Sequence, residues 1–426
     1  EIHERLVGSE MCIRDSNYRE TLQKYPSLFP STPSEQAPDV IAYVDPKFKM
    51  PQVWRSNLNV DIQLPYDFML SVGAMYTRDI YNVAQINMNE AEPTGVYNEQ
   101  PDRIYWASKK YEYNDYTNGK NVVVKLSNGE DKGYQYSFNA ILTKKYDFGF
   151  TGSIGYTYTM AKDLTANPGS APNSAWQNNV AVNSLNDPGV SYSLFSTPHR
   201  IIANASYEIN YAKCLKTTFS LFYSGYHTGR YSYTYYNDMN GDGNYSDLIY
   251  VPNSQDEMTF VDITDKSGAI TYSAVDQAKD FWDFVNNDSY LKDRKGKYVE
   301  RNGSLTPWIN RFDFKIAQDF YATLGGRKYG IQVSLDMLNV GNMINSKWGA
   351  YQSCGLKSYD NVQLLKTASK VGEPLTYQIN ANSREAFKER SSWQYTNTIG
   401  SAWSMQLGVK AVSYTHLRAH ETLMNL

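Results

Sequence analysis

The connections between the predicted strands of this chain alternate strictly between very short and very long, and no other feature constrains the fold as strongly. The short links are Pro65–Tyr66, Lys145–Tyr146, Tyr211–Lys213 and Thr323–Arg327; the long ones are roughly residues 89–119, 161–196, 237–306 and 341–392. Loops of this length are uncommon in a compact soluble domain. Tight turns at one end and long loops at the other are the pattern of an outer-membrane β-barrel, with short periplasmic turns and long extracellular loops.

Between these links, apolar and polar residues alternate with a period of two. In residues 147–160, Phe148, Phe150, Ile154, Tyr156, Tyr158 and Met160 fall on one face, and Gly, Ser and Thr fall on the other. The same alternation recurs in residues 57–64, 329–337 and 403–410. Period-two alternation predicts strands with one apolar face. A soluble sandwich alternates too, so the strict succession of short and long links separates the two folds.

The pattern predicts an all-β chain: an antiparallel transmembrane β-barrel, present in part. We expect nine strands, near residues 53–64, 67–80, 120–144, 147–161, 199–210, 214–236, 307–320, 328–340 and 395–411. Residues 17–50 contain five prolines, which cannot donate ladder hydrogen bonds, so the stretch 17–52 is predicted to be an extracellular loop before a partial barrel over residues 53–411. Because single-chain bacterial barrels have even strand numbers, an odd count predicts that N-terminal strands are missing.

Composition excludes several other classes of protein. The formal net charge of −3 offers no basic field for phosphates, so no nucleic-acid partner is expected. Aromatic residues make up 14% of the chain and include 37 Tyr, which suit a membrane–water boundary. No apolar run approaches the roughly 18 residues of a transmembrane helix. The cysteines Cys12, Cys214 and Cys354 form no CxxC pair, so neither a zinc site nor a disulfide framework is predicted.

The two ends differ in texture from the middle. Residues 1–16 (EIHERLVGSEMCIRDS) and 412–426 (VSYTHLRAHETLMNL) resemble translated sequencing-adapter read-through, and we interpret them as non-native tails. On this interpretation the spacing of His416, His420 and Glu421, which mimics a helical metal motif, has no functional meaning.

Five segments in order resemble the C-terminal barrel of Oar-like TonB-dependent receptors, which are relatives of the SusC-type nutrient importers. They are FSTPHRIIANASYEINYAK (195–213), SLFYSGYHTGRYSYTY (220–235), NDMNGDGNYSDLIYVP (237–252), PWINRFDFKIAQDF (307–320) and VSLDMLNVGNMIN (333–345). The resemblance extends over nearly all of residues 17–411 and implies about nine C-terminal strands of a 22-stranded barrel.

This resemblance implies a non-enzymatic fragment of an active transporter. The intact protein would import a bulky nutrient (an oligosaccharide, a peptide or a metal chelate) across the cell outer membrane. Outer-membrane lipid, the TonB complex acting through a missing plug region, and a nutrient ligand at the extracellular loops are the implied partners. A surface lipoprotein is a further candidate partner. The chain departs from the family in lacking the plug, the early strands and a terminal aromatic at the end of the last strand.

The strongest local motif is an Asp/Asn/Gly-rich stretch in the third long link. Oxygen-bearing side chains occur at alternate positions, and a Gly permits a sharp turn; the candidate ligands are Asp238, Asn240, Asp242, Asn244 and Asp247. This spacing resembles the first half of a calcium loop, but position twelve is Ile249 in place of Glu. The sequence therefore offers calcium as a candidate cofactor, with a plain Asn/Asp/Gly surface turn as the alternative. No other cofactor is predicted.

Other polar residues have structural explanations. His199 and Arg200 begin a strand and are expected to anchor a loop at the barrel rim. Arg311 and Asp313 share the face opposite Phe312 and Phe314, which predicts polar packing in the lumen in place of acid–base chemistry. Trp308, Trp348, Trp393 and Trp403 could stack on a sugar, although an aromatic girdle or loop packing is the default in a barrel.

Two other functions compete with active transport. One is a passive porin-like or adhesin-like outer-membrane barrel without a plug. The other is a secreted carbohydrate-binding β protein, which would bury its apolar strand faces in a sandwich.

Overall fold

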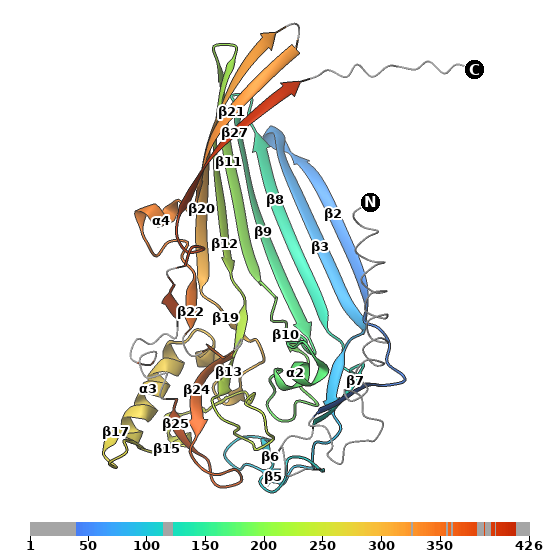
Figure 1. The fold of residues 1–426 in the computed structure, drawn as a ribbon, viewed down its shortest axis with the longest axis vertical. Coiled ribbons are helices and arrows are strands. Elements are labelled where there is room, and N and C mark those ends of the chain that lie inside the picture. Colours follow the sequence, from blue (N-terminus) through green and yellow to red (C-terminus); the bar gives the residue numbers. More distant parts are fainter. Residues whose placement is uncertain are drawn as a thin grey trace, which may run out of the picture.

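A long curved sheet and a compact cap at one end of it make up the molecule (Figure 1). The computed structural model describes residues 40–113, 122–324, 327–354, 357–358, 361–380, 387, 393–396 and 398–414. The predicted N-terminal tail, most of the predicted loop 17–52 and residues 415–426 lie outside the described residues. Helices are short and few in the described part, and none is long and apolar enough to cross a membrane, a finding that says nothing of a β-barrel.

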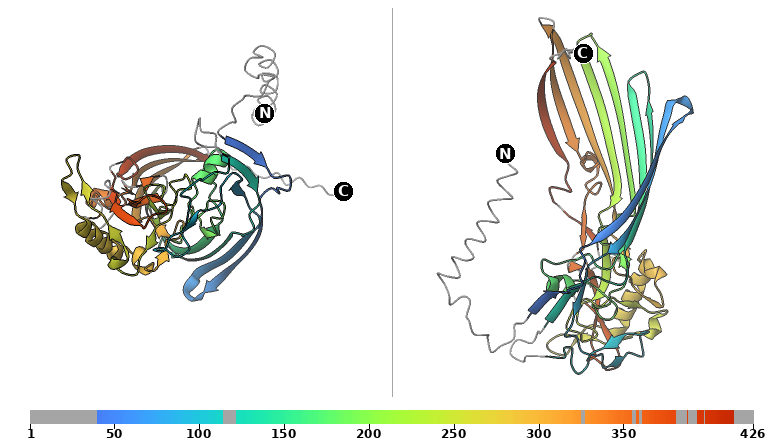
Figure 2. Two further views of the ribbon diagram at one scale, coloured as in Figure 1. Left: turned by 90° about the horizontal axis from the view of Figure 1, so that it is seen from below. Right: turned by 90° about the vertical axis from the view of Figure 1, so that its right-hand side faces the viewer.

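The sheet is an antiparallel meander in which each long strand pairs with the next one along the chain. Its strands are β2 (Gln52–Leu64), β3 (Phe68–Tyr81), β8 (Tyr134–Lys145), β9 (Phe150–Asp163), β11 (His199–Tyr211), β12 (Leu215–His227), β20 (Trp308–Leu324), β21 (Arg327–Leu338) and β27 (Ser404–Tyr414). A short strand, β10 (Ser191–Tyr192), adds to the end of β9. The sheet curves without closing: among the described residues β2 and β27 have one neighbour each (Figure 2).

Tight turns join the strands at the end away from the cap. Tyr66 and Asp67 both have positive φ, near 61° and 57°, and so do Ala212 and Lys213, near 51° and 54°. Two consecutive left-handed residues are the backbone of a type I′ turn, whose twist matches that of the strands it joins. All long connections therefore leave the sheet at the opposite end, as the alternation of link lengths predicts.

The predicted strand ranges each overlap one strand of this sheet, but three of them include cap residues. The range 120–144 divides at a Gly- and Asp-rich turn into β7 (Val122–Ser127) and β8, and only β8 joins the sheet. The range 214–236 divides after His227 into β12 and β13 (Arg230–Tyr235). The range 395–411 begins too early, because Thr398 O accepts from the backbone N–H groups of Ser401 and Ala402 in a turn before β27. Hydrophobic alternation continues through the second and third breaks, which is why it does not reveal them, whereas the first break falls in the polar segment 128–133, where the alternation stops.

Two predicted domain assignments also differ from the observed strands. β1 (Val40–Val44) pairs in parallel with β7, so part of the predicted loop 17–52 is a cap strand. β27 continues to Tyr414, and its residues Val412–Tyr414 pair with β21 across the predicted boundary at residue 411.

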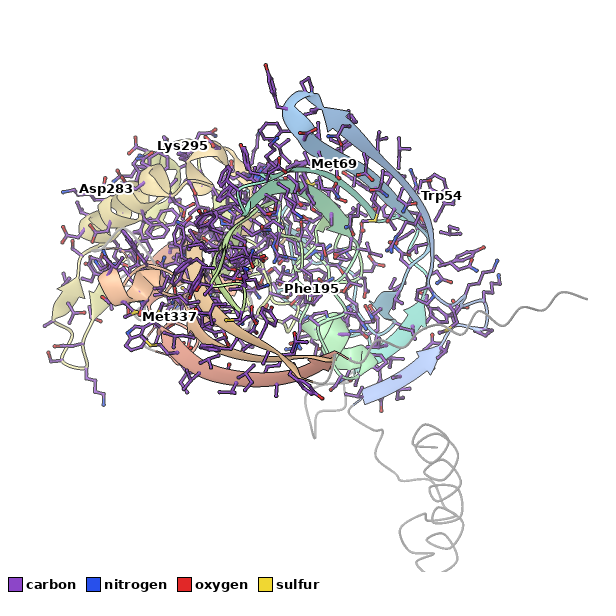
Figure 3. The ribbon with its side chains drawn as sticks, turned by 90° about the horizontal axis from the view of Figure 1, so that it is seen from above. Trp54, Met69, Phe195, Asp283, Lys295 and Met337 are labelled. Carbon is purple, nitrogen blue, oxygen red and sulfur yellow. The ribbon has the colours of Figure 1, made fainter. Side chains whose placement is uncertain are left out.

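The two faces of the sheet differ in chemistry because residues that pair across an antiparallel ladder share a face. One row joins Ile62, Leu70, Leu142, Ile154, Ala203, Tyr223 and Phe312, and the next row on the other face joins Gln63, Met69, Thr143, Ser153, Asn204, Phe222 and Asp313. Trp54 of the apolar face points away from the curve, whereas Met69 of the polar face lies inside it (Figure 3). The convex face is therefore apolar and the concave face mainly polar.

Aromatic side chains gather at both ends of the convex face. Near the cap, Trp54 contacts Tyr76, with ring centroids 6.0 Å apart, and Tyr136 contacts Tyr158 at 6.2 Å. Near the tight turns, Phe148 contacts Tyr146 at 5.1 Å and Tyr207 at 6.3 Å. Ile154, Leu221 and Leu407, between these clusters, remain substantially exposed. An exposed apolar band between two aromatic girdles is the outer surface of a transmembrane barrel.

The cap consists of short strands and helices from the long connections. Its strands besides β1, β7 and β13 are β4 (Ala84–Asn87), β5 (Gly95–Val96), β6 (Ile104–Tyr105), β14 (Tyr250–Val251), β15 (Thr259–Phe260), β16 (Ile263–Thr264), β17 (Ile270–Tyr272), β18 (Lys297–Tyr298), β19 (Ser304–Leu305), β22 (Gln352–Cys354), β23 (Lys357–Ser358), β24 (Asn361–Thr367), β25 (Thr376–Ile379) and β26 (Trp393–Tyr395). Its helices are α2 (Pro172–Gln177) and α3 (Ala274–Asn287), with 3-10 turns at Gln255–Glu257 and Leu291–Asp293. Helix α4 (Gly341–Ile344) follows β21 and lies beside β20, apart from the cap (Figure 1). Ser273 caps the N-terminus of α3, because its Oγ accepts from the backbone N–H of Asp276.

A matched pair of substitutions tests the assignment of the faces. Ile154→Arg places a charge in the apolar band and should destabilise the protein by about 2–4 kcal/mol in a lipid bilayer. Ser153→Arg, one residue earlier on the concave face, should cost clearly less. Denaturant unfolding of the full protein in lipid vesicles measures both. Equal destabilisation by the two substitutions would contradict a lipid-facing convex side.

Candidate functional site

The long connections do not form separate loops but fold together over one hydrophobic core. Tyr97, Val180, Tyr233 and Leu364 come from four different connections and are all buried in this core. β13 pairs in parallel with β24 over residues far apart in the sequence, and β15 pairs in parallel with β25. The cap is therefore a packed unit whose residues hold fixed positions above the concave face.

Arg103 joins three of these connections through its guanidinium group, which is completely buried. Its terminal nitrogens donate to the carbonyl oxygens of Val182 and Leu248, and Nη1 lies 3.4 Å from Oδ1 of Asp247. The guanidinium also lies over the Tyr298 ring, 4.8 Å from its centroid. A buried charge is tolerated only when it is paired and hydrogen-bonded, as this one is.

Gln100 extends this network to the fourth connection. Its side-chain nitrogen donates to the hydroxyls of Tyr235 and Tyr377, both at 2.9 Å, and its oxygen accepts from Nε of Arg103 at 3.1 Å. Sequence reasoning missed both Gln100 and Arg103. No local signal marks them, because the residues that surround them come from other connections.

The predicted calcium ligands lie together in one tight loop of the cap. Asp238 accepts from the backbone N–H groups of Gly241 and Gly243, at 2.7 and 2.9 Å. Asn240 Oδ1 accepts from Asp242 N at 3.0 Å, and Asp242 Oδ1 accepts from Asn244 N at 2.7 Å. Gly243, with φ near +93°, occupies the sixth position, where calcium loops require a residue able to turn sharply.

This loop is not the solvent-exposed surface turn that was the alternative. Asn240, Asp242, Asn244 and Asp247 are all buried. Burial raises the pKa of Asp238, and it raises the pKa of Asp242 well above its usual range, with further contributions from the negative charges of Asp247 and Asp238. Burial also raises the pKa of Asp247 to about 7, although the adjacent Arg103 lowers it. The cap thus holds three mutually repelling carboxyl groups.

The donors of a cation site are only partly assembled here. Among the described residues, no group of three or more His, Cys, Asp or Glu side chains is placed to hold a metal ion. Ile249, at the twelfth position, is buried, and its N–H donates to the carbonyl oxygen of Tyr233, so it supplies no side-chain ligand. Side-chain nitrogens of Asn240 and Asn244 are buried without hydrogen-bond partners among the described residues. A bound cation would therefore need amide and backbone oxygens as ligands in addition to the aspartate carboxylates.

The remaining residues singled out in the sequence lie apart from this loop. His199 is on the convex face, where Nδ1 lies 2.6 Å from the Tyr156 hydroxyl, and Arg200 is on the concave face. Arg311 Nε lies 3.1 Å from Asp313 Oδ1, which also accepts from Asn339 N at 2.7 Å. This pair is on the polar concave face, as predicted.

The four tryptophans do not converge on a common sugar site. Trp308 is on the convex face, with its ring 5.0 Å from that of His227, so it belongs to the aromatic girdle. Trp393 packs on Tyr231 of the cap core at 5.2 Å. Trp348 and Trp403 are partly exposed, and no ring contact joins any two of the four in the described part of the chain.

Substitution of Arg103 tests its role in joining the connections. Arg103→Met leaves the partners of the guanidinium buried and unpaired, and should destabilise the cap by about 3–5 kcal/mol. Lys109→Met removes an exposed ion pair with Glu112, which solvent screens, and should leave stability nearly unchanged. Near-ultraviolet circular dichroism during denaturation in detergent measures both. Similar losses in the two variants would exclude a special role for Arg103.

Comparison with known proteins agrees with the architecture. A model of the outer membrane beta barrel domain family matches residues 13–349, which is most of the chain. Neither the curated proteins nor the solved structures contain a match. With its apolar convex face, its two aromatic girdles and this family match, the chain belongs to the outer membrane beta barrel domain family and is located in the outer membrane.

Proposed function

We propose that this chain is part of a TonB-dependent transporter that imports a bulky nutrient, an oligosaccharide, a peptide or a metal chelate. The observation that carries the proposal is the open sheet. β2 and β27 each have one neighbour among the described residues, and unpaired backbone groups are not tolerated in hydrocarbon. A barrel closed by additional strands would leave no such groups unpaired, and a barrel much larger than nine strands would have a lumen wide enough for a plug.

The packed cap favours a gated importer rather than an open pore. Four connections pack into one core over the concave face, so a solute from outside meets folded protein in place of mobile loops. A passive porin-like barrel is the second candidate, because the concave face is mainly polar. The structure does not fit a secreted sandwich, because the apolar residues of the convex face are exposed, whereas a sandwich would bury them.

Transport in living cells distinguishes the first two functions. Growth on an oligosaccharide as carbon source should require this protein, and it should stop in cells that lack TonB or have an uncoupled inner membrane. The purified full-length protein should show no steady ion conductance in a planar bilayer. Steady conductance, together with growth that persists without TonB, would instead establish a passive pore.

We also propose that the Asp238–Asp247 loop binds calcium. The support is the order of its hydrogen bonds, in which the first, third and fifth positions each accept backbone N–H groups within the loop, together with the three buried carboxyl groups. A divalent cation would relieve their mutual repulsion. Calcium would then act as a structural ion that stabilises the cap.

A conservative substitution tests this cation site. Calcium at a hundred times its Kd should stabilise the full protein by about 2.7 kcal/mol relative to a chelator. Asp242→Asn should abolish this response without lowering stability in the chelator, because the buried carboxyl group is itself unfavourable. Asp265→Asn removes an aspartate of a similar but exposed turn in the β16–β17 hairpin and should leave the calcium response intact. A response unchanged by Asp242→Asn would refute the site.

The pH dependence of the calcium effect follows from the raised pKa values. An aspartate whose pKa is higher in the folded protein than in the unfolded chain destabilises the fold as pH rises, because the unfolded chain loses its proton first. For Asp247 this penalty begins near the unfolded value of 3.8 and is complete above about pH 7. Calcium binds deprotonated carboxylates, so its stabilising effect should be larger at about pH 8 than at about pH 5. Thermal unfolding with calcium or chelator at both pH values measures this.

A further inference from the structure

Phe195 marks a cleft on the concave side of the sheet, beneath the cap. It lies between β10 and β11, is 79% exposed, and occupies the middle of the curve when the molecule is viewed from above (Figure 3). Two hollows, of about 350 and 280 Å³, share Phe195 as a common wall. Together they approach the size of pockets that hold small molecules.

The cleft is lined by groups that both donate and accept hydrogen bonds. Gln135, Thr157, Thr159 and Arg200 project into the larger hollow from the concave faces of β8, β9 and β11. Asn178, Asn179 and Asn302 line the smaller hollow, with Arg301. So many hydroxyl and amide side chains in one cleft can hydrogen-bond the hydroxyl groups of a sugar, because each sugar hydroxyl also donates and accepts.

Two buried polar atoms of the cleft lack a hydrogen-bond partner among the described residues. One is the hydroxyl of Ser196, which is 3% exposed and lines the larger hollow. The other is Nε of Arg301, which is 2% exposed and lines the smaller one. The remaining nitrogens of Arg301 bind Asp163 and Gly189. An unsatisfied buried polar atom is unfavourable, so both hollows offer a bonding position to a ligand.

The charged side chains that line the cleft indicate an anionic ligand. No Asp or Glu lines either hollow, and the described residues place no carboxylate in an ion pair with Arg200. Another cavity, bounded by β4 and β7, shows the opposite balance: Asp45, Glu130, Asp131 and Asp187 line it with a single Lys125. A guanidinium binds a planar carboxylate through two parallel hydrogen bonds.

We infer that this cleft binds an acidic sugar, a uronic acid unit of an oligosaccharide. Its carboxylate contacts Arg200, its hydroxyls contact the Thr, Ser and Asn side chains, and its ring packs on Phe195. The inference rests on the proposed import function, for which it names a substrate class and a position between the cap and the concave face.

Calorimetry on the full-length protein in detergent tests the site. A trimer of galacturonic acid should bind at least about tenfold more tightly than the matching neutral trimer of galactose, as expected for a hydrogen bond to a charged group. Arg200→Gln should abolish this preference, and Phe195→Ala should weaken both trimers. Arg78→Gln, which removes an exposed arginine from the convex face of β3, is the matched control and should bind like the wild type.

Three results would overturn the inference: equal affinity for the two trimers, uronate binding unaffected by Arg200→Gln and Phe195→Ala, or an equal loss with Arg78→Gln. Circular dichroism and elution as a single species establish that each variant is folded. Uptake is measured separately in cells that contain or lack TonB. Binding without TonB-dependent uptake would refute the transport function and leave the site, whereas TonB-dependent uptake without binding here would refute the site alone.

Discussion

The need to pair every backbone group inside a hydrocarbon layer is the constraint on which this structure depends. Within the bilayer no water is available to the backbone, so each strand must bond to neighbours on both sides. The meander from β2 to β27 meets this need for every strand between its two outer ones. Its tight turns are set by left-handed pairs such as Tyr66–Asp67 and Ala212–Lys213. Because those turns occupy one end, every long segment must emerge at the other.

The long segments then face a different problem, which they solve by folding onto one another. Their aromatic and aliphatic residues bury one another in a common core, and the buried Arg103 holds three connections together through two carbonyl oxygens and Asp247. Removal of a charge from water is costly, so such a group is stable only in the assembled cap. This makes the position of the cap above the concave face a property of all four connections together.

Charged side chains of opposite sign gather at two places, one in the cap and one beneath it. Buried carboxyl groups repel one another in the Asp238–Asp247 loop, whereas the cleft around Phe195 contains arginines and no acidic side chain. The first arrangement suits a cation that stabilises the cap, and the second suits an anionic ligand that passes beneath it. Two strands position these two sites. β13 ends just before the acidic loop and anchors it in the cap core, and β11 begins just after Phe195 and anchors the cleft at the sheet.

The sequence by itself determined the features that depend on neighbouring residues. Period-two alternation predicted the strand faces, including Arg311 and Asp313 opposite Phe312. The spacing from Asp238 to Asn244 predicted a turn-rich loop, and the hydrogen bonds observed in it join residues only two to five positions apart. Tertiary structure alone decided the division of residues 120–144 and 214–236 between sheet and cap, the burial of Asp247 against Arg103, and the cleft that joins Arg200 to Arg301. These contacts connect residues about a hundred or more positions apart, and their free energy depends on burial, which local patterns do not encode.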